Sequence, residues 1–139
     1  MLNNIKARST ITIIVTVAIV SLFLRITIKR ILKVTISGNE SSALVNLRLI
    51  STALENYAKD HFASYPANLS ALVKTSPSYL DEDYVSGSPV KGYIYSCPRL
   101  ETGGYTCSAA PLKCRVTGKI IYTVTTGGLL VSDDCSKKE

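Results

Sequence analysis

The chain of 139 residues has no tryptophan, one histidine (His61) and no pair of cysteines with C-x-x-C spacing. Structural zinc sites use cysteines and histidines at such short spacings, so zinc is the weaker interpretation of the cysteines. No serine or threonine nucleophile has a partner base in the sequence, and His61 is most simply either a favourable charge near a helix end or a surface residue. The sequence therefore predicts a protein that is not an enzyme and has no small-molecule substrate.

Acidic residues are absent from the first 39 positions, where lysine and arginine together occur six times. The remaining ten basic residues are balanced by all ten acidic residues, so the net charge of +6 belongs to the N-terminal segment. A nucleic-acid-binding domain carries basic residues on its own surface. Residues 37–139, which follow the basic segment, are formally neutral. The distribution argues against nucleic acid as a partner and favours a helix that emerges through anionic lipid head groups.

Charged residues are also missing from Ser9–Leu24, a run rich in Ile, Val and Leu between Arg8 and Arg25. As a helix this run covers about 24 Å, slightly less than a hydrocarbon core of about 30 Å, so the flanking arginines would extend toward the head groups. The residues before Arg25 contain no A-x-A-like site for signal peptidase. The sequence predicts a single-pass membrane anchor rather than a signal peptide removed at that end.

Proline and glycine are absent from Ser9–Ile36, and Ser37-Gly38-Asn39 is the first helix breaker. At this point the helix either ends or bends and continues. We therefore expect a basic leader (residues 1–8), a transmembrane helix with a basic extension (residues 9–36) and an extracytoplasmic domain (residues 37–139).

Apolar side chains recur at intervals of three and four after the breaker, which is typical of an amphipathic helix. The expected buried face is Leu44, Leu47, Ile50 or Ser51, Leu54 and Tyr57 or Ala58, and the expected outer face is Arg48, Glu55, Asn56 and Lys59. Tyr65-Pro66 marks the end of this helix, because the residue before a proline disfavours the helical conformation. Asn68–Val73 predicts one or two further helical turns, and a long loop follows from Pro77 to Pro89.

Beyond Gly92 the apolar period changes from 3.6 to 2, which predicts strands. The expected strands are Gly92–Cys97, Tyr105–Ala109, Lys119–Thr125 and Leu129–Ser132, with turns at Leu100–Gly104 and Gly127-Gly128. A small antiparallel sheet needs one face covered, and the helix supplies the only long apolar stripe. The predicted fold class is α+β: a long N-terminal helix, first transmembrane and then amphipathic, packed on a small antiparallel β-sheet.

All four cysteines, Cys97, Cys107, Cys114 and Cys135, lie in the C-terminal third. An even number in a small domain beside a membrane anchor predicts two disulfides formed in an oxidising compartment, with three connectivities open. A five-residue turn at Leu100–Gly104 would put Cys97 opposite Cys107, which favours Cys97–Cys107 with Cys114–Cys135. Disulfides place the domain outside the cytoplasm, although the positive charges flanking the anchor favour the opposite orientation by one charge.

Two motifs and the order of the parts resemble type IV pilins and type II secretion pseudopilins. Asn46–Ala58 resembles that family's N-L-R-x-I-x-x-A-x-x-x-Y helix, and Tyr65–Leu69 resembles the Y-P-x-x-L that ends it. Gly92–Tyr95, Gly104–Thr106 and Thr126–Leu130 resemble its sheet strands. The resemblance implies a pilin-like fold, a helix in the bacterial inner membrane and a C-terminal domain in the periplasm or outside the cell.

The resemblance also implies processing and partners. The family's spacing places prepilin peptidase cleavage between Ala7 and Arg8, followed by N-terminal methylation. Like or homologous pilin subunits would pack against the helix through Ile11, Ile14, Ala18 and Leu22. The front end departs from the family, because Arg8 stands where phenylalanine is usual and Thr12 stands where the family has a glutamate that meets a neighbouring N-terminus.

Two short acidic segments are weak candidates for calcium, which pseudopilins can hold in such loops: Asp81 with Asp83, and Asp133 with Asp134. Neither has the spacing of an EF-hand, so a solvated charge run is the simpler interpretation, and no other cofactor is expected.

Two functional hypotheses arise from these features. The leading one is a non-enzymatic pilin-like subunit that assembles into, or caps, a type IV pilus or a type II secretion pseudopilus. The alternative is a monomeric, membrane-tethered binding domain on a pilin scaffold that does not polymerise, which Arg8 and Thr12 favour.

Overall fold

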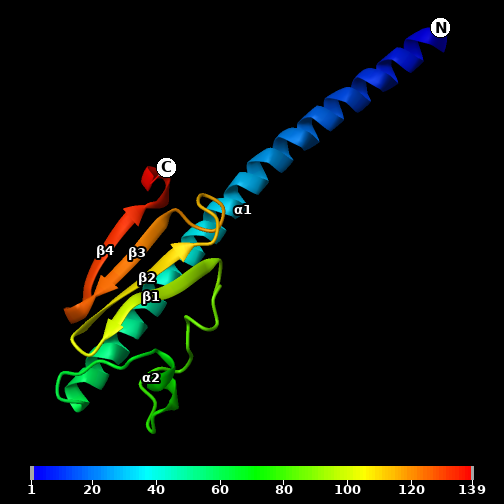
Figure 1. Ribbon diagram of the computed structural model, residues 1–139. Helices are drawn as coiled ribbons and strands as arrows, with labels where there is room; N and C mark the ends of the chain where they lie inside the picture. Colours follow the sequence, from blue (N-terminus) through cyan, green and yellow to red (C-terminus); the bar gives the residue numbers. More distant parts are fainter. Residues whose placement is uncertain (1, 139) are drawn as a thin grey trace. The chain divides into compact units, whose positions relative to one another are not determined.

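A computed structural model describes the backbone of residues 2–138 and the side chains of residues 9–137. Its elements are α1 (Leu2–Asp60), α2 (Ser70–Lys74), β1 (Tyr93–Glu101), β2 (Gly104–Pro111), β3 (Ile120–Thr125), η1 (Thr126–Gly128), β4 (Leu129–Asp134) and η2 (Cys135–Lys138) (Figure 1). The chain forms two compact units, Met1–Val34 and Thr35–Glu139. The boundary falls just before the predicted breaker at Ser37-Gly38-Asn39.

Helix α1 continues through that breaker. Gly38 is exposed, and an added Cβ there would meet nothing within 4 Å, so this glycine costs the helix only about 1 kcal/mol of intrinsic propensity. The next two residues bond to the connection between β2 and β3, which is distant in sequence. Asn39 Nδ2 donates to the Thr117 carbonyl at 2.9 Å, and the Lys119 amide donates to Glu40 Oε1 at 2.7 Å. These long-range contacts favour continuation of the helix over a break at Gly38.

The helix ends at Asp60, earlier than the Tyr65-Pro66 signal. Phe62 and Ala63 both adopt left-handed backbone conformations, with φ of 55° and 60°. The Ala63 amide donates back to the Ala58 carbonyl at 2.8 Å, which satisfies a helix-end acceptor. The chain therefore turns away before the proline is reached.

One face of α1 packs on the sheet, which is the predicted α+β arrangement (Figure 1). Leu47, Ile50 and Leu54 are fully buried, and they share a core with Tyr93, Tyr105 and Val124 of the sheet. The predicted helix face is shifted slightly at its start, because Ala43 rather than Leu44 is fully buried.

The sheet is antiparallel in the order β1-β2-β3-β4. The four strands overlap the predicted segments, although β1 and β3 each begin one residue later than predicted. The first turn also differs from the prediction: Leu100, Glu101 and Gly104 belong to strands, and only Thr102 and Gly103 form the turn. The register then shifts between Ser96 and Arg99, so that Cys97 and Pro98 together lie opposite Cys107. This β-bulge accommodates Pro98, which has no amide hydrogen for a regular ladder.

Two disulfides join Cys97 to Cys107 and Cys114 to Cys135, which is the pairing expected from the sequence. The shorter turn alone would have moved Cys97 out of register by one residue, and the bulge restores it. The second disulfide ties the C-terminal end of the chain to the connection between β2 and β3.

Candidate membrane anchor and polar groove

Helix α1 is long and apolar enough to cross a membrane once: its most apolar window has a mean hydropathy of 2.5, and none of that window is buried inside the molecule. The large apolar side chains from Ile11 to Val34 are exposed, each by 46% or more. Apolar surface on this scale is unfavourable in water and suits either lipid or other helices.

Hydroxyl groups in this segment are bonded within their own helix. Thr16, Ser21 and Thr27 each donate to the carbonyl four residues earlier, at 2.8, 2.8 and 2.9 Å. A hydroxyl without a partner is costly in hydrocarbon, and back-bonding of this kind removes that cost. The hydroxyl groups of Thr16, Ser21 and Thr27 are therefore compatible with a membrane interior.

The predicted assembly residues lie on one face of this helix. Ile11, Ile14 and Leu22 are 61%, 63% and 63% exposed, and Ala18 is also exposed. Their spacing of three, four and four residues places them in one stripe, with the small Ala18 near its middle. The predicted cleavage residues Ala7 and Arg8 lie outside the residues whose side chains the structure describes.

Glu55 was predicted to face away from the sheet, and this prediction is wrong. Its Oε1 accepts hydrogen bonds from the Tyr105 hydroxyl at 3.0 Å and from the Gly127 amide at 2.7 Å. The Tyr65 hydroxyl lies 3.2 Å from both carboxylate oxygens. We call this group the Glu55 clasp, because it joins α1 to the segment after the helix, to β2 and to η1. One signal was present in the sequence: Glu55 follows the buried Ser51 by four residues and so shares its face.

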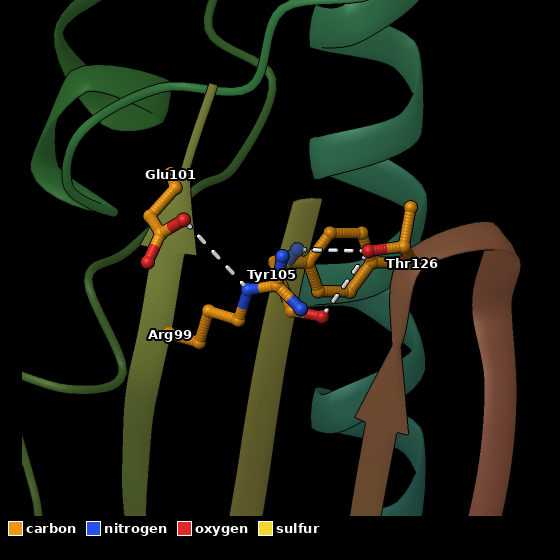
Figure 2. A network of polar contacts seen from close by, with 4 residues as sticks. All are labelled: Arg99, Glu101, Tyr105 and Thr126. Atoms are coloured by element: carbon orange, nitrogen blue, oxygen red, sulfur yellow. Dashed lines mark hydrogen bonds and ion pairs between the residues drawn. The ribbon is translucent and has the colours of Figure 1, made fainter. Parts of the chain in front are cut away.

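The same region is fixed from the sheet side by Thr126 (Figure 2). The Thr126 hydroxyl accepts from the Tyr105 amide at 2.9 Å and donates to the Tyr105 carbonyl at 3.3 Å. A Cβ on the neighbouring Gly104 would lie 2.5 Å from this hydroxyl, so only glycine permits the approach. The exposed ion pair between Arg99 and Glu101, at 3.8 Å on β1, is the only salt bridge among the described side chains (Figure 2).

The buried tyrosines remain neutral hydrogen-bonding groups. Burial raises the pKa of Tyr105 to about 12, and it also raises the pKa of Tyr93, whose hydroxyl donates to the Ile120 carbonyl at 2.8 Å. The pKa of Tyr65 is raised by burial and then by the charge of Glu55. These phenols therefore act as donors at neutral pH: Tyr105 links β2 to α1 through Glu55, Tyr65 links the segment after α1 to the same carboxylate, and Tyr93 links β1 to β3.

A polar groove of about 430 Å³ lies beside the clasp, between α1 and the β3–β4 hairpin. One wall is a helical stripe of Arg48, Thr52, Asn56 and Lys59. The other wall is formed by Val124, Gly128 and Leu130. Ser51 and Glu55 also line the groove. Within residues 9–137, the four side chains of the helical stripe make no hydrogen bond or ion pair, so this stripe presents two cations and two neutral polar groups to solvent beside the Glu55 carboxylate.

The candidate calcium residues are not gathered into one site. Asp83 accepts hydrogen bonds from the amides of Val85 and Ser86 and from the Ser86 hydroxyl, at 3.1, 3.2 and 2.7 Å. The amide and hydroxyl of Ser136 bind Asp134 and hold the pKa of that carboxyl below its usual value. No group of three or more His, Cys, Asp or Glu side chains suited to a metal occurs among the described residues.

His61 lies just beyond the end of α1, as expected. Its ring stacks on Tyr57 with centroids 3.8 Å apart, and its Nδ1 is 2.8 Å from the Tyr57 carbonyl. The ring is exposed, and its contacts satisfy the helix terminus.

Comparisons of the chain with protein families, with curated proteins and with solved structures gave no match. The pilin resemblance therefore stays a prediction from the motifs of the sequence.

Proposed function

We propose that this protein is a non-enzymatic, pilin-like subunit. Helix α1 anchors it in the bacterial inner membrane, its disulfide-bonded domain lies in the periplasm or outside the cell, and it assembles with like or homologous subunits into, or at the cap of, a type IV pilus or type II secretion pseudopilus. The observation that carries the proposal is the exposed apolar surface of α1, whose residues Ile11, Ile14, Ala18 and Leu22 form one stripe.

Lateral packing of helices accounts for this stripe in physical terms. Lipid tails are as apolar as leucine, so helix association in a membrane depends on close van der Waals contact, which small residues permit. Ala18 supplies such a position between the larger Ile14 and Leu22. The internally bonded hydroxyls of Thr16, Ser21 and Thr27 leave this association to packing rather than to polar bonds between helices.

The first test is the intact mass of the protein extracted from its native membrane, with and without reduction and thiol alkylation. We expect loss of residues 1–7, an N-terminal methyl group on Arg8 and four thiols that react only after reduction. An uncleaved chain with protected thiols would contradict the pilin-like function in its usual form. Four freely reactive thiols would contradict the extracytoplasmic location.

The second test addresses assembly itself with a matched pair of substitutions. Ala18→Leu adds three carbon atoms on the proposed face, and Val20→Phe adds four carbon atoms on the opposite face, so both variants enlarge an apolar side chain by a similar amount. We expect Ala18→Leu to lower the yield of filaments or cross-linked oligomers in membranes, while Val20→Phe leaves it unchanged. Equal effects of the two variants would argue that the stripe is not the packing surface.

A monomeric, membrane-tethered binding domain is the second candidate. The polar groove favours it, since the groove offers unpaired polar side chains to a partner without any need for polymerisation. An uncleaved chain that stays monomeric at high density in the membrane would support this candidate over the first.

A further inference from the structure

We infer that the groove beside α1 is the docking site for the acidic loop Asp81–Asp83 of a second copy of this chain. The inference rests on the proposed function, because it names a contact between subunits that stands outside the membrane helix. Two observations support it: the groove has two cations, Arg48 and Lys59, and the exposed carboxylates Asp81 and Glu82 form no ion pair among the described residues.

The spacing of the cations selects an extended ligand. Arg48 and Lys59 lie about 16 Å apart along the axis of α1, which is too far for one carboxylate or one phosphate to bind both closely. Their long apolar stems let both charged ends lean toward a segment lying between them. Thr52 and Asn56 occupy the interval and can bond to the backbone of that segment. Glu55 also lines the groove, and its carboxylate offsets one of the two positive charges, so the lining keeps one net positive charge.

The acidic loop has the complementary charge and is available. Asp81 and Glu82 are exposed and form no ion pair in the described part of the chain. Asp83 instead bonds to its own loop through the Val85 and Ser86 amides, which fixes the shape of the turn that presents the other two carboxylates.

Most other carboxylates of the domain are already engaged. Their partners are the Lys119 amide for Glu40, the clasp for Glu55, Tyr79 for Asp60, Arg99 for Glu101 and Ser136 for Asp134. Asp133 is exposed, but it is held in β4 opposite Ile121 and cannot enter a groove as a loop would. Asp81 and Glu82 are both exposed, and the one side-chain hydrogen bond of this pair within the described residues joins Glu82 to Tyr84. They are therefore the two carboxylates most accessible to a second copy.

Groove and loop are two different patches of one domain. A contact of one patch with the other patch of the next copy is heterologous, and it generates an open chain of subunits when the rotation does not close. Each added copy would fill one groove and present one new loop. This geometry agrees with a filament and disagrees with a symmetric dimer.

The test uses the full chain in membranes, with a photo-reactive p-benzoylphenylalanine in place of Asn56 at the middle of the groove. Two differently tagged copies are co-expressed, and the cross-linked species that carries both tags is measured. The groove variant is Arg48→Glu with Lys59→Glu, and the loop variant is Asp81→Lys with Glu82→Lys. The control is Lys113→Glu with Lys119→Glu, which makes the same charge change at exposed positions outside the groove.

We expect the groove variant alone and the loop variant alone to lose about tenfold in cross-linked product, as removal of two exposed ion pairs and their replacement by repulsion predicts. Co-expression of the two variants should restore the product, because every groove then meets a loop of opposite charge. The control should match the wild type, and all variants should keep both disulfides.

Three results would overturn the inference: no copy-to-copy product in the wild type, equal products from the variants and the control, or no rescue in the mixed pair. Filaments that form equally well from all variants would overturn the groove contact and leave the proposed function standing. A wild type that never assembles, by filament or by cross-link, would overturn both.

Discussion

Replacement of Glu55 by alanine tests whether the clasp holds the domain together. The substitution removes one acceptor from three donors, the hydroxyls of Tyr65 and Tyr105 and the Gly127 amide. Hydrogen bonds to a charged group contribute about 1.5–3 kcal/mol each, so a simple sum would give a very large loss.

The structure argues for a smaller loss. Tyr105 is 1% exposed but keeps a second partner, the Ser51 hydroxyl at 2.8 Å. Gly127 is exposed and Tyr65 is half-buried, so water can replace the lost acceptor at both. We therefore expect Glu55→Ala to lower the free energy of unfolding by about 2–3 kcal/mol, which corresponds to a fall in melting temperature of about 10 °C or more for a domain of this size.

The assay is thermal unfolding of the full chain in detergent, followed by the near-ultraviolet circular dichroism of the tyrosines. Asn56→Ala is the matched control, because its side chain has no partner in the described structure and its loss should change stability by less than about 0.5 kcal/mol. Glu55→Gln should fall between the two, since it keeps an acceptor but loses the charge. If Glu55→Ala melts within about 2 °C of Asn56→Ala, the clasp does not stabilise the fold and our reasoning is wrong.

Three further predictions concern the tyrosines, the helix end and the disulfides. The pKa of Tyr105 is raised from 10.0 to about 12 in the folded domain, so its contribution to stability is complete below pH 10 and is lost as pH rises through about 12. We expect the part of the tyrosinate absorbance near 295 nm that is missing from a Tyr105→Phe variant to appear together with unfolding, and its appearance near pH 10 with the fold intact would contradict this. Phe62→Gly should raise the free energy of unfolding by about 1 kcal/mol in the same melting assay, because Phe62 is fully exposed at a φ of 55°, where glycine has no steric penalty. A loss of stability would show that the Phe62 ring makes a stabilising contact. Replacement of either disulfide by two alanines should lower the free energy of unfolding by about 3 kcal/mol, because loops with sequence separations of 10 and 21 residues restrict the unfolded chain. An unchanged melting temperature in either variant would contradict this.

The sequence predicted the strands well because alternation of apolar and polar residues is a local property. The segment Lys119–Thr125, for example, became β3 at Ile120–Thr125, and Leu129–Ser132 became the start of β4. The buried residues Leu47 and Leu54 were predicted from helical periodicity in the same way.

Features that depend on distant parts of the chain could not be predicted. Continuation of α1 past Gly38 depends on Asn39 and Glu40, whose partners lie 78 and 79 residues away. The disulfide pairing matched the prediction because a shorter turn and the bulge at Cys97 and Pro98 offset each other, and neither was foreseen. The groove was not foreseen at all, since helical periodicity assigns Arg48 and Lys59 to an outer face without showing that the β3–β4 hairpin stands opposite them.

Strand β4 is the last strand in the sheet order, and this place bears on the solubility of the domain. A last strand leaves one row of backbone amides and carbonyls without a neighbour, and Leu129 and Val131 on it are exposed. Strands of this kind invite unwanted pairing between chains that are held close together. Here the strand is short and ends in Asp133 and Asp134, and the Cys114–Cys135 disulfide fastens the chain directly after it. Reduction of that disulfide is therefore expected to promote aggregation along this edge as well as to lower the stability of the domain.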